Sequence, residues 1–199
     1  MQRRPIKRFP GVRVPAGMHV RLRDFDEILG IEFVSLTGSL LAGFLLALII
    51  GDLRLLPGLL VLLPGFLEMS GDISGSLAAR LSSGLFLRAV EPRWSFRQSY
   101  LRGNLAAALA LGLFVSCALG IVAWAVTLLL GGLNQPVLIA VALLAGLLAN
   151  IVEIPLTVAG VFWLFKRGHD PNNVIGPLVT TMGDVVSIVA LAVALAVLL

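Results

Sequence analysis

The chain has 199 residues, of which 58% are hydrophobic and 13% are charged, and its net charge is +4. Soluble domains carry about 25% charged residues, so this chain has roughly half the usual share. No charged residue occurs between Arg102 and Glu153, an interval long enough for two membrane-spanning helices. The composition excludes an ordinary soluble domain and predicts an all-α, polytopic membrane protein. The single cysteine, Cys117, excludes an internal disulfide framework.

The chain opens with a short basic arm, residues 1–32, which we expect on the cytoplasmic side. The end of this arm, residues 21–33, is predicted to form a juxtamembrane amphipathic helix. The remaining residues, 33–199, are predicted to form one transmembrane domain of five helices. The hydrophobic segments that predict these helices are 33–51, 55–88, 101–130, 136–165 and 173–198.

The second hydrophobic segment is longer than a membrane requires. As a helix its residues would extend about 50 Å, against a hydrocarbon core of about 30 Å. It must therefore tilt, protrude or break. Ser70, Gly71 and Gly75 lie where a break is expected, and backbone unwound at this depth would have to line a wet cavity or be buried in protein.

Lysine and arginine predict the orientation in the cell membrane, because cytoplasmic loops carry an excess of both. The arm, the loop after the second segment and the loop after the fourth segment are all basic, and five crossings place these three regions on one side. The opposite side keeps only Arg54 in its short loops. The N-terminus is therefore expected in the cytoplasm and the C-terminus outside.

Four acidic residues fall inside the hydrophobic segments: Glu68, Asp72, Glu153 and Asp184. Burying each costs at least about 2.5 kcal/mol, so such residues usually face a bundle interior and mark an ion or proton path. Asp184 lies near the predicted bilayer centre, and Glu68 and Asp72, four apart, share a helix face with Ser76. Glu153 is expected toward the cytoplasmic half.

The side chains near these acids offer oxygen ligands, with no thiolate or intramembrane histidine among them. Such a set suits Mg²⁺, Ca²⁺ or Mn²⁺ better than zinc or copper. The predicted ligands of the transported ion are Asp184, Asp72, Glu68, Thr181 and Ser76. No catalytic residue and no cofactor are expected, and composition does not separate Mg²⁺ from Na⁺ or H⁺.

Two of the intramembrane charges also have structural interpretations. Arg80 would neutralise Asp72 or Glu68 in an ion pair. Glu153 would be a lone acid near the inner interface, hydrogen-bonded to Asn150 or approached by Lys166.

Two motifs resemble those of a known family. The run DPNNVIGPLVTTMGD, residues 170–184, resembles the last-helix signature of the MgtE divalent-cation transporters and their solute-carrier relatives. That signature has a DP start, a later proline and a TT pair before an intramembrane Asp. The run GDISGSLAARLSSG, residues 71–84, resembles the second-helix signature and is similar to the single-unit archaeal and eukaryotic solute-carrier branch.

The resemblance implies a homodimer whose ion pathway runs between subunits and is lined by the second and fifth helices. It also implies that Asp184 matches the pore Asp of the family, whereas Asp72 stands where the family usually has Asn. The large cytoplasmic Mg²⁺-sensing region of bacterial MgtE has no counterpart in the 32 residues before the first segment.

The expected function is transport of a divalent cation, most of all Mg²⁺, across the cell membrane. The expected partners are membrane lipid and a second copy of the chain, and no nucleic acid. One alternative is an exchanger coupled to Na⁺ or H⁺. Another is a membrane enzyme of the CDP-alcohol phosphotransferase type. Asp72 and Arg80 resemble the motif of these enzymes only faintly, because the spacing between the motif residues differs. A third is a scaffold without transport activity.

Overall fold

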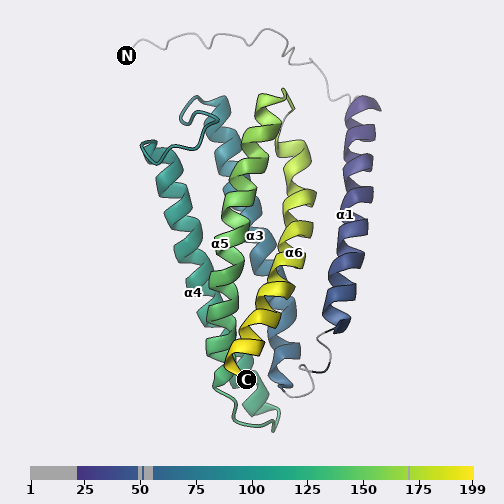
Figure 1. The fold of residues 1–199 in the computed structure, drawn as a ribbon, viewed down its shortest axis with the longest axis vertical. Coiled ribbons are helices and arrows are strands. Elements are labelled where there is room, and N and C mark those ends of the chain that lie inside the picture. Colours follow the sequence, from purple (N-terminus) through teal and green to yellow (C-terminus); the bar gives the residue numbers. More distant parts are fainter. Residues whose placement is uncertain (1–21, 49–50, 52–55, 170) are drawn as a thin grey trace.

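The computed structural model describes residues 22–48, 51, 56–169 and 171–199. The first part of the predicted basic arm and Arg54 lie outside these residues. Every regular element in the described part is an α-helix, as the sequence predicts (Figure 1). The helices are α1 (Leu22–Leu48), α3 (Gly58–Phe86), α4 (Ser99–Leu129), α5 (Val137–Lys166) and α6 (Pro171–Leu198).

The turn between α4 and α5 shows how the sequence ends one helix and begins the next. Gly131 adopts a φ of +78°, a left-handed conformation that glycine reaches without steric cost. The following N–H, of Gly132, donates to the carbonyl of Thr127 at 2.9 Å, which satisfies a carbonyl at the helix end. Pro136 then precedes the first residue of α5. The run GGLNQP, residues 131–136, therefore forms the turn between the two helices.

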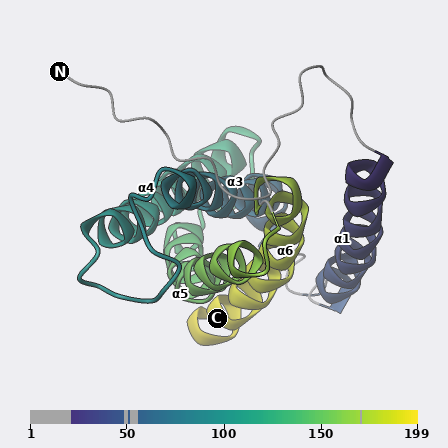
Figure 2. The same ribbon diagram turned by 90° about the horizontal axis from the view of Figure 1, so that it is seen from above.

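The helices α3, α4, α5 and α6 form a bundle, and α1 stands beside it. Helix α6 contacts α1, α3 and α5, while α4 packs on α3 and α5. Seen from above, α1 lies to one side, next to α6 (Figure 2). The interior of the bundle contains large side chains that are almost fully buried: Phe66, Leu59, Leu77, Leu138, Val158 and Leu191.

Helix α3 is continuous from Gly58 to Phe86, so the expected break at Ser70, Gly71 and Gly75 is wrong. Its 29 residues extend about 43 Å. The neighbouring α4 and α5, with 31 and 30 residues, are equally long. All three helices are longer than a hydrocarbon core of about 30 Å. Because α3 does not unwind in its middle, its extra length extends beyond the core at the helix ends.

Helix α1 also differs in one respect from the prediction. It begins at Leu22 and continues to Leu48, so the expected juxtamembrane helix and the first span are one helix.

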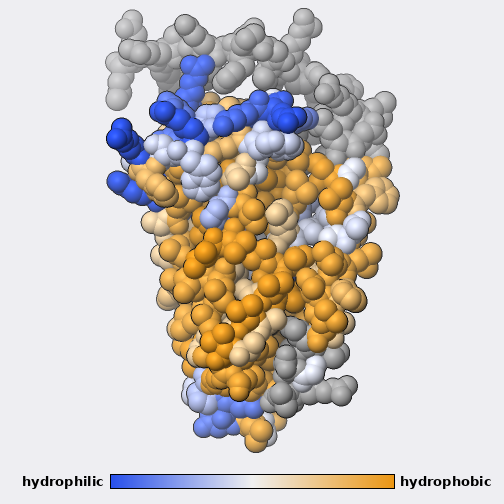
Figure 3. Space-filling view, in the orientation of Figure 1, coloured by the Kyte–Doolittle hydropathy of each residue, from blue (hydrophilic) through white to orange (hydrophobic). Residues whose placement is uncertain are grey.

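The surface is that of a multi-pass membrane protein. In the described part of the chain, four helical segments are long and apolar enough to span a bilayer: Leu29–Leu48, Ser99–Leu129, Val137–Lys166 and Val174–Leu198. Helix α3 runs beside them between the same two ends and is less apolar because it carries Glu68 and Asp72 (Figure 1). A broad hydrophobic band covers the visible face, with hydrophilic residues gathered above it and below it (Figure 3).

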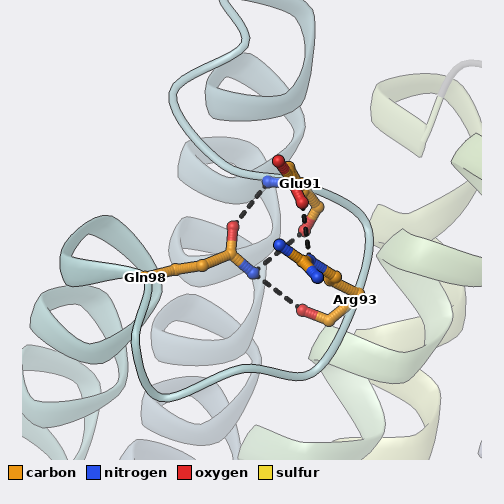
Figure 4. Close-up of polar contacts among 3 residues, drawn as sticks. All are labelled: Glu91, Arg93 and Gln98. Atoms are coloured by element: carbon orange, nitrogen blue, oxygen red, sulfur yellow. Dashed lines mark hydrogen bonds and ion pairs between the residues drawn. The ribbon is translucent and has the colours of Figure 1, made fainter.

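The loop between α3 and α4 is fastened by the side chain of Gln98 (Figure 4). Its amide oxygen accepts a hydrogen bond from the backbone N–H of Glu91 at 2.6 Å, and its amide nitrogen donates to the carbonyl of Arg93 at 2.9 Å. Arg93 and Glu91 form an ion pair. Close by, the Tyr100 hydroxyl donates to the carbonyl of Arg80 at 2.9 Å, which ties the last turns of α3 to the start of α4.

Candidate metal-ion groove

A groove of about 800 Å³ follows α3 where this helix meets α6. The residues of α3 that line it recur every three or four positions and so form one face of the helix. Helix α6 adds Thr180 and Asp184, which are themselves four residues apart. The full lining is Pro64, Leu67, Glu68, Gly71, Asp72, Gly75, Ser76, Ala79, Thr180 and Asp184.

Four of the five predicted ligands line this groove: Glu68, Asp72, Ser76 and Asp184. Glu68, Asp72 and Ser76 are exposed, although they lie in the middle of a helix that crosses an apolar band. Asp184 is half-buried, and it lies near enough to Glu68 for their charges to interact. Residues more than 100 positions apart in the sequence therefore place their carboxylates in one cavity.

Thr181, the fifth predicted ligand, does not line the groove. Its hydroxyl lies 2.5 Å from the hydroxyl of Ser35 in α1 and 2.9 Å from the carbonyl of Pro177, to which it donates. The neighbouring Thr180 lines the groove instead, with its hydroxyl donating to the carbonyl of Gly176 at 3.1 Å. One residue turns a helix by about 100°, so a TT pair places one hydroxyl on each of two faces.

Arg80 does not form the ion pair that the sequence allowed. Its side chain is exposed, and within the described part of the chain no ion pair joins it to Glu68 or Asp72. Arg80 therefore leaves the groove carboxylates open to a ligand.

Glu153 lies in the bundle interior, only 5% exposed. Its carboxylate accepts hydrogen bonds from three serines: Ser70 at 2.6 Å and Ser74 at 3.1 Å on one oxygen, and Ser187 at 3.1 Å on the other. It therefore lies at mid-depth beside the centre of α6, and the expectation of a lone acid near the inner interface is wrong.

The partners proposed for Glu153 from the sequence are also wrong. The Asn150 amide donates to the carbonyl of Gly146 at 2.6 Å and not to Glu153. Sequence reasoning missed the serines, although Ser70 and Ser74 are spaced four apart in an apolar helix and Ser187 follows Asp184 by three residues.

The groove offers a cation oxygen ligands and space. Mg²⁺ binds oxygen and usually keeps several of its waters, so widely spaced carboxylates suffice to hold it. With about 30 Å³ for each water, the volume accommodates a hydrated ion. Within residues 22–48, 51, 56–169 and 171–199, no three His, Cys, Asp or Glu side chains gather closely enough to hold a bare metal ion.

Comparison with known proteins gives one match. The family model MgtE, described as a divalent cation transporter, matches residues 63–194, which include most of α3 and α6 and all of α4 and α5. No curated protein and no solved structure matches the chain. Both walls of the groove lie within the matched region.

Proposed function

Because the chain belongs to the MgtE family of divalent cation transporters, we propose that it moves Mg²⁺ across the cell membrane along the groove between α3 and α6. The observation that carries the proposal is the meeting of Glu68, Asp72 and Asp184 in one cavity at the depth of the apolar band. Intramembrane acids are costly and mark ion pathways. The family is one of transporters and not of enzymes.

The chemistry of the groove supports Mg²⁺ as the ion. Its polar lining consists of carboxylates and hydroxyls, the hard oxygen ligands that Mg²⁺ prefers over softer donors. The carboxylates are spread along α3 and α6, a spacing suited to an ion that moves with part of its water shell. Ser76 and Thr180 contribute hydroxyls between the charges.

The groove supports a homodimer. Glu68, Asp72 and Ser76 are exposed along one side of α3, where lipid would contact ionised groups at great cost. A second copy laid against this side covers the carboxylates, doubles their number and encloses a wet pathway between the subunits. Irregular or polar surface at membrane depth is tolerated where it lines such a cavity.

The distribution of basic residues supports a cytoplasmic N-terminus. Arg88, Arg93 and Arg97 follow α3, and Lys166 and Arg167 end α5, at the same end of the bundle as the start of α1 (Figure 1). Hydrophilic residues gather at this end (Figure 3). By the excess of positive charge on cytoplasmic loops, this end faces the cytoplasm.

The test is Mg²⁺ flux into liposomes that contain the purified, folded protein and a trapped Mg²⁺ indicator. We expect uptake down a Mg²⁺ gradient, a response to an imposed membrane potential, and loss of uptake in Asp184→Asn. The control variant is Glu91→Gln, which removes a carboxylate from a loop outside the groove. Absence of divalent flux from folded protein would refute the proposal. Flux that requires a Na⁺ or H⁺ gradient would show that the protein is a coupled exchanger and not a passive pathway.

A further inference from the structure

Behind the groove, three helices meet at one buried carboxyl group. Ser70 and Ser74 of α3 and Ser187 of α6 all donate to Glu153 of α5. On α3 these serines alternate with Glu68 and Asp72, and a step of two residues turns a helix by about 200°. The same helix segment therefore presents acids to the groove and hydroxyls to Glu153.

Glu153 lacks a counter-charge within the described residues. The polar and charged groups that act on it are the three serines and the carboxylate of Asp184 on α6. Glu68 and Asp72 lie on the opposite face of α3, and α4 carries no charged residue between Arg102 at its start and its end. An ionised carboxylate buried without a cation is very costly. The site must therefore bind a positive ion, either a proton or a metal.

The distances favour a proton. A metal ion would lie between the oxygens and hold the hydroxyls apart from the carboxylate. Here the Ser70 hydroxyl oxygen lies 2.6 Å from a Glu153 carboxyl oxygen, a direct hydrogen bond that leaves no space for a metal ion between the two atoms. Gly183 closes the cluster, since a methyl group at its Cα would lie 2.8 Å from the Ser70 hydroxyl oxygen and 3.8 Å from the Glu153 carboxyl.

The serines can hydrogen-bond to the Glu153 carboxyl in both of its protonation states, because a hydroxyl both donates and accepts. The ionised group accepts from all three. When a proton binds to Oε1, the new O–H donates to the Ser187 oxygen, and Oε2 still accepts from Ser70 and Ser74. The Ser187 hydroxyl hydrogen then turns to the carbonyl four residues earlier, as helical serines commonly do. One proton is added and no buried polar group loses its partner.

A cavity of about 90 Å³ provides access between α5 and α6. Glu153 and Gly183 lie at one end of its lining, and Trp163 and Ile175 lie at the other, toward the end of α5. Glu153 therefore has an approach between α5 and α6 that is separate from the groove.

We propose that Glu153, Ser70, Ser74 and Ser187 form a proton-binding site behind the groove, and that this proton and the cation in the groove oppose each other's binding. The second half rests on the proposed function. Asp184 and Ser187 are neighbours on one face of α6, so a divalent ion at Asp184 makes the surroundings of Glu153 more positive and favours release of its proton. Coupling between two binding sites is reciprocal, so the proton weakens cation binding by the same factor.

Infrared spectroscopy of the full chain in lipid nanodiscs tests the proton site without any transport assay. A protonated carboxyl group has a C=O stretching band that an ionised one lacks. We expect the wild type to show such a band near neutral pH, Glu153→Gln to lose it, and Asp184→Asn to retain it. Ser187→Ala should shift the frequency of this band while the helices remain folded. This second variant keeps the test valid if Glu153→Gln does not fold.

Two infrared outcomes would overturn the proton site. One is a carboxylic-acid band that is unaffected by both Glu153→Gln and Ser187→Ala. The other is a band that disappears when Na⁺ replaces a bulky organic cation at constant pH, which would make the cluster a sodium site. Neither outcome depends on whether the protein transports Mg²⁺.

Calorimetry tests the linkage. Mg²⁺ is titrated into the protein in two buffers of different ionisation enthalpy, and the difference in heat gives the protons released. We expect release of up to one proton per chain in the wild type and much less in Glu153→Gln. Equal release by both proteins would refute the linkage. Failure of the wild type to bind divalent ions would refute the proposed function and the linkage but leave the infrared result intact.

Discussion

Asp184 and Asp72 line the same groove in different surroundings. Asp184 is half-buried at the middle of α6, near the charge of Glu68, whereas Asp72 is exposed on α3. A buried charge interacts more strongly with a passing ion because less water screens it. Asp184 should therefore dominate ion binding, and Asp72 should adjust it.

The substitution Asp184→Asn keeps size and hydrogen bonding and removes the charge. We expect Mg²⁺ flux to fall about tenfold or more, the effect of losing about 1.4 kcal/mol of interaction with the ion. The melting temperature should be unchanged or higher, because an ionised intramembrane acid is costly. Flux and thermal unfolding are measured side by side with Asp72→Asn, for which we expect altered affinity with flux retained. Wild-type flux in Asp184→Asn would make this residue a bystander.

Thr180 and Thr181 form a matched pair, since one residue faces the groove and the next faces α1. Thr181→Ala removes the hydrogen bond with Ser35 and should destabilise the protein by about 0.6–2 kcal/mol, the range for interhelical hydrogen bonds in membranes. Thr180→Ala removes a hydroxyl that bonds within its own helix, so it should cost less stability than Thr181→Ala and reduce ion affinity. Unfolding in detergent and flux in liposomes separate the two effects. The assignment of faces fails if the two variants exchange these phenotypes.

The residue types of the site could be predicted from the sequence, and their partners only in part. The spacing of Glu68, Asp72 and Ser76 predicted one helical face, because local helix geometry fixes it. The choice between Thr180 and Thr181 depends on the rotation of α6 about its axis, which packing on α1 and α3 determines. The Ser187 contact with Glu153 joins two helices and leaves no local pattern in the sequence.

At the scale of elements, the hydrophobic segments predicted five helices and their approximate limits. The predicted 101–130 and 136–165 became Ser99–Leu129 and Val137–Lys166. The prediction failed where glycines suggested a break in α3. Gly71 instead allows close packing on α6, where a Cβ atom would lie 3.2 Å from the Thr180 side chain. Glycine in a membrane helix more often brings helices together than interrupts one, which the sequence alone does not distinguish.

Arg80 extends the polar face of α3 beyond the groove. It follows Asp72 by eight residues, about 12 Å along the helix, and lies next to the groove-lining Ala79. A positive charge at this distance repels an approaching cation, and salt screens the repulsion within about 10 Å at 0.1 M. The groove should therefore admit cations more readily once the charge is removed.

We expect Arg80→Gln to raise the initial rate of Mg²⁺ uptake at low ionic strength, and the increase to shrink as salt is added. Arg80→Lys keeps the charge and is the control. The backbone carbonyl that accepts from Tyr100 remains in both variants, so the α3–α4 contact is preserved. A rate that falls in Arg80→Gln and is restored by lysine would instead show that the cation holds the groove together.

At the scale of the whole molecule, the α3 side of the bundle exposes carboxylates and a hydroxyl, whereas the α4 side exposes apolar residues. Phe114 of α4 is 74% exposed on a helix that carries no charge after Arg102. Such a surface suits lipid. The α3 surface with Glu68, Asp72 and Ser76 does not, and a dimer joined there would remove it from lipid.

Cross-linking tests that arrangement. In a chain with Cys117→Ala, we expect Ser76→Cys to form covalent dimers with a short bifunctional thiol reagent in native-like membranes. The control Phe114→Cys should not do so. A mass measurement in nanodiscs gives the oligomeric state independently. Monomers alone, or dimers that form through Phe114→Cys and not through Ser76→Cys, would contradict a pathway shared between subunits.

The position of α1 determines the order in which the molecule can be completed during synthesis. Its described polar contacts with the bundle join Ser35 to Thr181 and Pro177 of α6, across 142 to 146 residues of sequence. Gly38 lies against the same threonine. Helix α1 therefore leaves the ribosome long before α6 exists and lies in the lipid while the later described helices are inserted. Docking of α1 onto α6 thus comes late in the folding of each chain, and a chain truncated before α6 lacks the described polar contacts of α1.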